Sequence, residues 1–230
     1  MTTLSIVIPA YNEERFIGTL LQQIRAVDLE PLGIRKEIVV VDDCSADRTS
    51  EIVAGFSEVR LHRQPVNGGK GKAVRQGISM ATGELLIIQD ADLEYDPSDY
   101  LPMLRAFLED RGDVVYGSRY LGRGRHARQS LTAYLGGRSL SLACALATGR
   151  FLTDTVTAYK LFRRADLASV DLQTTGFELD HEITSRLLAR GLKIVEVPIR
   201  YVPRSREEGK KIGLRDWFIA LRTFYRYRNG

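Results

Sequence analysis

Short apolar runs alternate with helical patterns along the first half of the 230-residue chain, and this alternation constrains the fold more than any other feature. Strands are predicted at residues 4–8, 37–41, 59–62, 85–89 and 114–117, and helices at 13–26, 47–56, 71–81 and 98–108. Such alternation is typical of a mostly parallel sheet covered by helices on both faces. The predicted strands are almost entirely apolar, as strands buried on both faces should be. The sequence therefore predicts an α/β fold.

The second half of the chain is less regular. We expect helices at residues 130–147 and 178–189, strands at 157–163 and 193–197, and a glycine- and arginine-rich loop at 122–129. No stretch rich in Pro, Gly or Ser divides the sequence. We therefore expect one catalytic domain over residues 1–211, followed by a C-terminal helix over residues 212–230.

The predicted C-terminal helix is amphipathic and basic. Its apolar and basic residues recur at helical spacing: Leu214, Trp217, Phe218, Leu221, Phe224 and Tyr225, with Arg215, Arg222, Arg226 and Arg228. This pattern is typical of a helix in a membrane interface and equally of a helix packed on a protein core.

The positive charge of the chain is concentrated in two segments. Residues 200–230 hold nine Lys or Arg against three Asp or Glu, so they contribute +6 to a net charge of +4 and leave −2 for the rest. Residues 119–138 add five arginines and no acidic residue. Segregated cations indicate an anionic partner, such as a phosphate group, a nucleic acid or a membrane surface.

Composition excludes several classes of protein. With 44% hydrophobic residues the chain can bury a full core, so it is neither disordered nor fibrous. Cys44 and Cys144 make no disulfide framework and fit a reducing compartment. No apolar run reaches the roughly 18 to 20 residues needed to cross a bilayer, and the N-terminus lacks the pattern of a signal peptide. We expect a cytoplasmic protein, soluble or peripheral on the cytoplasmic face of the membrane.

The carboxyl ends of the predicted strands are polar or glycine-rich. The segments at these ends are 9–13, 42–43, 64–70, 90–92 and 117–119. Because ligands of open α/β sheets bind at the carboxyl ends of the strands, these segments are expected to surround one site.

Three carboxylates occupy alternate positions after the apolar run at 85–88: Asp90, Asp92 and Glu94. In an extended chain alternate side chains share a face, so these could converge on one hard cation such as Mg²⁺ or Mn²⁺. An ion held by few carboxylates keeps positions for phosphate oxygens and water, which indicates a nucleotide-bearing substrate. The alternative is an acidic loop end that caps a helix or faces solvent. The polar ends of the neighbouring strands favour the metal site.

Other motifs narrow the choice of site. The stretch at 67–72 lacks the spacing of a phosphate-binding loop, and Ala73 stands where such a loop has Ser or Thr. No dinucleotide fingerprint follows the first predicted strand. Asp42 and Asp43 suit either a turn and helix cap or hydrogen bonds to a ribose or a base. The histidines share no metal-ligand spacing: His62, His126 and His181.

A cluster of carboxylates lies at the start of the helix predicted at 178–189. Glu178 and Glu182 are four residues apart and share a helix face, and Asp180 lies between them in the sequence. They are either solvated helix charges or a base that takes a proton from an acceptor.

Together these motifs resemble inverting family-2 glycosyltransferases, and within them the dolichyl- and polyprenyl-phosphate mannose or glucose synthases. The resemblance runs from about residue 4 to residue 212. It rests on an ordered set of segments: Pro9-Ala-Tyr-Asn-Glu13, Val-Val-Val-Asp42-Asp43-Cys-Ser45, Gly69-Lys-Gly-Lys72, Asp90-Ala-Asp92-Leu-Glu94, Gly117-Ser-Arg119-Tyr120 and Glu196-Val-Pro-Ile199. It implies a Rossmann-like A-type glycosyltransferase fold, a nucleotide-sugar donor and a magnesium or manganese ion.

The resemblance also implies roles for individual residues. The donor nucleotide is expected to contact Pro9, Tyr11, Glu13, Asp42, Asp43, Lys70, Asp90 and Ala91, and the metal ion Asp90, Asp92 and Glu94. Arg119 and Arg138 are expected to grip phosphate, and the site is expected to be closed by Arg204, Lys210 and Lys211. Two positions depart from the family pattern, because Glu94 stands where the mannose synthases often have Gln, and Ala158 where Gly is usual.

We therefore expect a metal-dependent inverting glycosyltransferase that moves a hexose from a donor of the GDP-mannose or UDP-glucose type to a polyprenyl or dolichyl phosphate. Its expected catalytic residues are Asp92, Arg119, Arg138 and Glu178. A lipid phosphate is already an anion at pH 7 and needs little or no base, whereas a hydroxyl acceptor needs a carboxylate to take its proton.

Two alternatives stay open. The first is transfer to a hydroxyl in polysaccharide or glycolipid synthesis, with Glu178, Asp180 or Glu182 as the base. The second is a non-catalytic nucleotide-sugar binding protein. Nucleic acid is not expected as a partner, because the predicted sheet lacks interleaved aromatic and basic residues.

Overall fold

The computed structural model describes residues 1–122, 131–203 and 214–229. Its centre is a seven-stranded sheet in the order β3-β2-β1-β4-β6-β5-β7. The strands are β1 (Thr2–Ala10), β2 (Ile34–Asp42), β3 (Val59–Arg63), β4 (Leu85–Ile88), β5 (Val114–Ser118), β6 (Lys160–Arg163) and β7 (Ile194–Pro198). Strand β6 is antiparallel to both of its neighbours, and the other neighbouring pairs are parallel. The predicted α/β fold with a mostly parallel sheet is confirmed.

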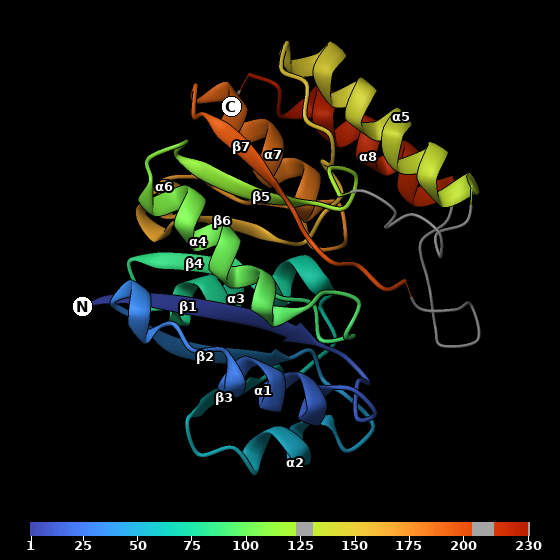
Figure 1. Ribbon diagram of the computed structural model, residues 1–230. Coiled ribbons are helices and arrows are strands. Elements are labelled where there is room, and N and C mark those ends of the chain that lie inside the picture. The colour runs from blue at the N-terminus through green and yellow to red at the C-terminus, as the bar shows by residue number, and fades with distance from the viewer. Residues whose placement is uncertain (123–130, 204–213, 230) are drawn as a thin grey trace.

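Helices cover both faces of this sheet (Figure 1). The helices α1 (Ile17–Ala26), α2 (Thr49–Ala54) and α4 (Tyr100–Leu108) pack on one face. The helices α3 (Lys70–Met80), α6 (Arg164–Ala168) and α7 (Leu179–Ala189) pack on the other. Two 3-10 helices are short connectors: η1 (Glu30–Leu32) and η2 (Pro97–Asp99). Strands β1 and β4 give alternate side chains to the two cores, which explains why their sequences are apolar at almost every position.

The reversed direction of β6 brings an additional strand end to the predicted site. Lys160, the first residue of β6, is paired with Tyr116 near the carboxyl end of β5. The amino end of β6 therefore lies at the same edge of the sheet as the carboxyl ends of the parallel strands. The apolar run predicted as a strand at 157–163 gave no indication of this direction.

Two further helices form an outer layer. Helices α5 (Leu131–Thr148) and α8 (Leu214–Arg226) lie side by side and pack on the same side of the molecule as α7 (Figure 1). Phe224 of α8 is buried in one cluster with Cys144 of α5, and its ring meets the ring of His181 of α7 with 4.8 Å between centroids. Phe218 and Tyr225 of α8 stay 64% and 65% exposed. Part of the apolar stripe of α8 thus packs on the protein, and part of it faces solvent.

Several predictions fall outside the described residues. They include the residues expected to close the site, which are Arg204, Lys210 and Lys211. They also include the predicted boundary between the catalytic domain and the C-terminal helix, at residues 211 and 212, and most of the loop at 122–129. Among the helices of the described segments, none combines the length and the apolar character that crossing a membrane requires.

Candidate active site

The predicted site residues that the structure describes gather at one edge of the sheet. The carboxyl ends of β1, β2, β4 and β5 meet there, together with the amino end of β6. Arg138 comes from α5, and Glu178 directly precedes α7. The sequence segments that were expected to surround one site are therefore brought together by the sheet.

The loops after β1 and β2 are tied to each other by hydrogen bonds. The Asn12 N–H donates to Ser45 Oγ over 2.9 Å, and the Glu13 N–H donates to Thr49 Oγ1 over 2.9 Å. Asn12 has a φ of 55°, which allows the sharp turn after β1. Tyr11 is 39% exposed at this turn. The nucleotide contacts expected at this loop stay predictions for Pro9, Tyr11 and Glu13.

Asp42 is fully buried, and serines engage its carboxylate. Its Oδ1 accepts the Ser45 N–H over 3.0 Å and also the Ser45 hydroxyl, while its Oδ2 accepts the Ser50 hydroxyl. The contact with the Ser45 N–H agrees with the turn interpretation, whereas α2 has no side-chain cap hydrogen bond. A contact of Asp42 with a ribose or a base stays a prediction.

Asp43 holds the glycine-rich loop before α3. Its Oδ1 accepts the Gly68 N–H over 2.8 Å, and its Oδ2 accepts the Gly69 N–H over 2.7 Å. The next glycine, Gly71, donates its N–H to Thr175 O over 2.7 Å. Gly69 has a φ of 87°, and a Cβ there would lie 2.5 Å from Thr175 O, so glycine is required. Protein oxygens occupy these N–H groups, which agrees with the rejection of a phosphate-binding loop from the sequence.

The acidic segment after β4 is not extended. Strand β4 ends at Ile88, residues 91–94 form a turn and a bend, and Leu93 has a φ of 59°. The expectation that Asp90, Asp92 and Glu94 share one face of an extended chain is therefore wrong, because the turn breaks the alternation of side chains. Within the described segments, no group of three His, Cys, Asp or Glu side chains is placed to hold a metal ion.

Each of the three carboxylates contacts a different part of the protein. Asp90 Oδ1 lies 2.8 Å from Lys70 Nζ. Asp92 Oδ1 accepts the Glu94 N–H over 3.1 Å and so stabilises the turn. Glu94 Oε2 accepts the Tyr201 hydroxyl over 2.6 Å. Glu94 thereby anchors the chain that leaves β7 toward residues 204–213.

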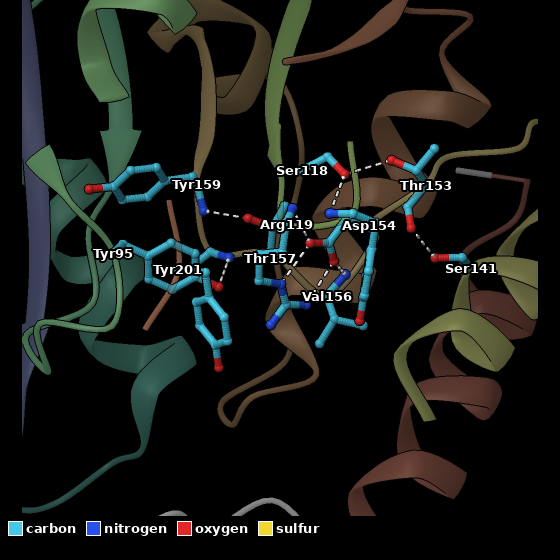
Figure 2. A network of polar contacts seen from close by, with 12 residues as sticks. Tyr95, Ser118, Arg119, Ser141, Thr153, Asp154, Val156, Thr157, Tyr159 and Tyr201 are labelled. Atoms are coloured by element: carbon cyan, nitrogen blue, oxygen red, sulfur yellow. Dashed lines mark hydrogen bonds and ion pairs between the residues drawn. The ribbon is translucent and has the colours of Figure 1, made fainter. Parts of the chain in front are cut away.

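Arg119 is buried and paired with Asp154 (Figure 2). Its Nε donates to Asp154 Oδ2 over 2.7 Å and its Nη2 donates to Oδ1 over 2.7 Å, which is a bidentate pair. Burial alone would lower the pKa of Arg119, but the Asp154 carboxylate holds it well above its usual range. The guanidinium also lies 5.0 Å from the centre of the Tyr201 ring. Arg119 is therefore fixed and charged before any ligand arrives.

Arg138 lies close to the same group of side chains. Its Nη1 donates to Thr153 O over 3.0 Å, one residue before the partner of Arg119. The guanidinium carbons of Arg119 and Arg138 each lie 5.6 Å from the centre of the Tyr120 ring. The two arginines that were predicted to grip phosphate are thus neighbours around one aromatic ring.

Glu178 borders the outer layer. Its Oε1 accepts the Gly176 N–H over 3.2 Å. It also lines a pocket of about 220 Å³ together with Arg222 and Arg226 of α8. Glu178 therefore lies beside the C-terminal helix.

The other two carboxylates of α7 are buried and engaged. Asp180 lies between Lys160 Nζ at 3.0 Å and Lys70 Nζ at 3.2 Å. Burial would raise the pKa of Asp180, but the two ammonium groups outweigh it and lower the pKa to about 2. Glu182 accepts the Thr174 N–H over 2.8 Å and pairs with Arg186 at 2.9 Å. Neither carboxylate is a solvated helix charge.

The comparison with known families agrees with this geometry. The model of "Glycosyl transferase family 2" matches residues 5–170. The chain belongs to glycosyltransferase family 2. It is 32% identical over 227 residues to the dolichol-phosphate mannosyltransferase of Pyrococcus furiosus, a match that covers 96% of this chain and 62% of that protein. The chain thus spans less than two thirds of the length of this relative.

Solved structures of other proteins have the same fold as this chain. One is glucosyl-3-phosphoglycerate synthase from Mycobacterium tuberculosis with UDP, at a TM-score of 0.72, 22% identity, and coverage of 99% of this chain and 80% of that chain. The same enzyme with Mn²⁺, UDP-glucose and phosphoglyceric acid has a TM-score of 0.70 and 20% identity over 96% of this chain and 76% of that chain. The expected A-type glycosyltransferase fold is confirmed.

The residues after β4 fit a divalent metal ion in their chemistry. Asp90 and Asp92 are only partly buried and offer the hard carboxylate oxygens that Mg²⁺ and Mn²⁺ prefer. Ala91 is 4% exposed and belongs to the core, so it holds the two aspartates against the sheet. A cation, the Lys70 ammonium, already lies at Asp90. Asp90 thus already binds a cation in this structure.

The sequence analysis missed three residues of the site: Asp154, Lys160 and Tyr201. Asp154 and Lys160 are fully buried charges, and each carried a signal in the sequence. Lys160 opens the otherwise apolar run Leu161-Phe162, and Asp154 stands among residues that are uncharged from 151 to 159. A charge in such surroundings needs a partner of opposite sign. Tyr201 carried no comparable signal.

Proposed function

We propose that the protein is a metal-dependent inverting glycosyltransferase that moves a hexose from a nucleotide sugar, of the GDP-mannose or UDP-glucose type, to a polyprenyl or dolichyl phosphate. Family membership supports the reaction type. The relative named a dolichol-phosphate mannosyltransferase supports the acceptor, since the similarity extends over 96% of this chain.

The observation that carries the choice of acceptor is the state of the α7 carboxylates. A hydroxyl acceptor needs a base that can hold a proton near neutral pH. Asp180 has a pKa of about 2 because two lysines contact it, so it is a weak base. Glu182 is fully buried and occupied by Arg186 and the Thr174 N–H. Glu178, which accepts the Gly176 N–H over 3.2 Å, is the carboxylate of the three that is left for a hydroxyl acceptor. An acceptor that is already an anion requires none of the three.

The arginines support a phosphate acceptor. Guanidinium groups bind phosphate through paired hydrogen bonds, and two of them lie beside the Tyr120 ring at the end of β5. Asp154 fixes the orientation of Arg119. Arg119 and Arg138 are therefore positioned to receive a phosphate group with little reorganisation.

The outer face of α5 supports a lipid acceptor. Four leucines at spacings of four, seven and four residues share one face of this helix, and they are 55% to 82% exposed: Leu131, Leu135, Leu142 and Leu146. Helix α5 contains no Asp or Glu, and its neighbour α8 carries Arg215, Arg222 and Arg226. A stripe of exposed leucines on a helix without acidic residues is typical of a surface that contacts a membrane. Such a surface would bring the site to a lipid-linked phosphate.

The division of roles follows from these positions. At Asp90 and Asp92 a bound Mg²⁺ or Mn²⁺ would supply neutralisation of the departing diphosphate. Asp92 also keeps the turn after β4 in place through the Glu94 N–H. Arg119 and Arg138 would hold the acceptor phosphate, whose oxygen attacks the sugar C1 from the face opposite the diphosphate and inverts its configuration.

The test is an analysis of products. The protein is incubated with GDP-mannose or UDP-glucose, Mn²⁺, and either a polyprenyl phosphate or a matched polyprenol. We expect a hexosyl phospholipid with inverted anomeric configuration, formed from the phosphate and not from the alcohol. Transfer to the alcohol alone would support the hydroxyl alternative, and binding of donor with no transfer to either would support a non-catalytic binding protein.

A further inference from the structure

Four charged side chains from separate parts of the chain form a line that ends at the edge of the sheet. Lys160 Nζ lies 3.0 Å from Asp180 Oδ1, and Lys70 Nζ lies 3.2 Å from Asp180 Oδ2 and 2.8 Å from Asp90 Oδ1. The exposure of these side chains rises along the line, from 0% at Lys160 through 9% and 12% to 22% at Asp90. The line links the protein interior to a proposed metal ligand.

The inner part of this line has a surplus positive charge. Asp180 carries one negative charge and contacts two ammonium groups, and a buried ammonium without a balancing anion is costly. Asp90 supplies the second negative charge. Burial alone would lower the pKa of Lys70, but Asp180 and Asp90 raise it above its usual range. Lys70 is therefore a charged group that depends on both carboxylates.

The backbone of Lys70 is fixed, whereas its side chain can move. The next two residues, Gly71 and Lys72, donate their N–H groups to Thr175 O over 2.7 Å and 3.3 Å. The lysine side chain is a flexible four-carbon stem. An ammonium that leaves Asp90 can therefore remain in contact with Asp180 while the helix stays in place.

We infer that Lys70 acts as an internal counter-ion, which a divalent metal ion must displace from Asp90 before that carboxylate can bind it. A divalent ion on either oxygen of Asp90 would lie close to the Lys70 ammonium, and like charges at such a distance repel. Asp180 and Lys160 are positioning residues, because they determine how far the displaced ammonium can go. This inference rests on the proposed function, since it assumes the metal site at Asp90 and Asp92.

Binding of the donor then relieves the repulsion between the metal ion and the Lys70 ammonium. A nucleoside diphosphate brings anionic oxygens to the same place, and the displaced Lys70 ammonium can pair with them. Binding of the metal ion and binding of the nucleoside diphosphate are therefore coupled through Lys70. The metal ion alone binds weakly, and the two ligands together bind tightly.

The test measures Mn²⁺ binding to the full chain by electron paramagnetic resonance, with and without UDP or GDP. In Lys70→Met we expect the Kd for Mn²⁺ alone to tighten about tenfold, within the usual range of coupling between sites. With the nucleoside diphosphate present, the same variant should bind Mn²⁺ more weakly than the wild type. A merely structural defect would weaken Mn²⁺ binding both without and with the nucleoside diphosphate. Weaker or unchanged binding of Mn²⁺ alone would overturn the inference.

The matched control is Lys72→Met, because Lys72 is exposed on the same helix and is absent from the line of charges. Its Mn²⁺ affinities should equal those of the wild type. If Lys70→Met does not fold, crystal structures of the wild type with and without Mn²⁺ test the inference through the contact between Lys70 and Asp90. Lys70 should leave Asp90 when Mn²⁺ is bound, and an unchanged Lys70–Asp90 pair beside bound Mn²⁺ would overturn the inference. Sugar transfer by the wild type is measured separately, so a failure of the proposed function is distinguishable.

Discussion

The carboxylates in the two halves of the site have different kinds of partner. On the donor side, at the ends of β1 and β2, the carboxylates of Asp42 and Asp43 accept hydrogen bonds from neighbouring loops. On the acceptor side, between β5, α5 and α7, buried carboxylates each neutralise a cation, as Asp154 does for Arg119. The donor side is thus a set of loops tied to two carboxylates mainly by neutral donors, with Arg63 Nε 3.4 Å from Asp42 Oδ2, and the acceptor side is a set of ion pairs.

This difference has a consequence for ligand binding. Loops tied to buried carboxylates mainly by serine hydroxyls and backbone N–H groups have a fixed shape. Ion pairs hold cations that are oriented in advance, so an anionic ligand can hydrogen bond to them with little reorganisation. We therefore propose that the loops after β1 and β2 recognise the shape of the donor, and that the arginines of the acceptor side recognise phosphate.

The largest expected effect concerns the proposed metal site after β4. Asp92→Ala removes a proposed metal ligand, and we expect sugar transfer to fall by about a thousandfold, the upper range for loss of one electrostatic contributor. Glu109→Ala is the control, because Glu109 is an exposed acidic residue at the end of α4. Steady-state rates at saturating Mn²⁺ provide the measurement. An Asp92→Ala enzyme with unchanged turnover would remove the metal site from the account.

The next effect concerns stability on the acceptor side. Asp154→Ala leaves the buried Arg119 guanidinium without its partner, and we expect a loss of about 3 to 5 kcal/mol in the free energy of unfolding. The double variant Arg119→Met/Asp154→Leu should recover most of this loss, because both charges are gone. Denaturant titrations of both variants and the wild type test this. If Asp154→Ala loses less than about 1 kcal/mol, the ion pair is not what organises this side.

A smaller effect concerns pH. Burial lowers the pKa of His181 to about 4, below its ordinary value of 6.5. A histidine with a lowered pKa in the folded state favours folding above pH 6.5, and this contribution is lost as the pH falls toward 4. We expect a loss of about 2 kcal/mol in the free energy of unfolding between pH 7 and pH 5. His181→Asn should lack this part of the pH dependence. Equal pH slopes for the two proteins would show that His181 does not titrate as described.

The smallest expected effect concerns the outer face of α5. Leu142→Glu places a charge within the exposed leucine stripe, and we expect about a tenfold weaker binding to vesicles with anionic lipids. Leu108→Glu is the control, since Leu108 is 51% exposed on α4 and lies outside the stripe. Co-sedimentation with vesicles measures both. Equal binding of the two variants would exclude α5 as the membrane-facing surface.

The sequence predicted most of the fold because helix and strand periodicity are local. The predicted helix at 71–81 corresponds to Lys70–Met80, and the predicted strand at 193–197 corresponds to Ile194–Pro198. The direction of β6 could not be predicted, because an apolar run reads the same for a parallel and an antiparallel strand. That direction places Lys160 at the site.

The site itself was predicted less completely. The sequence indicated which strand ends meet, and the family resemblance singled out Arg119 and Arg138, which lie beside the same Tyr120 ring. It did not indicate that Asp90, Asp92 and Glu94 lie on a turn, because the left-handed φ of Leu93 depends on tertiary contacts. Nor did it pair Arg119 with Asp154, since the two residues are 35 positions apart in the sequence. Long-range ion pairs leave no periodic signal.

The most direct test of the central claim is a crystal structure of the protein with Mn²⁺ and a nucleotide sugar. The account predicts that Mn²⁺ bridges the carboxylates of Asp90 and Asp92 and the donor diphosphate at the end of β4. A donor bound elsewhere, or a Mn²⁺ ion that contacts neither aspartate, would contradict it.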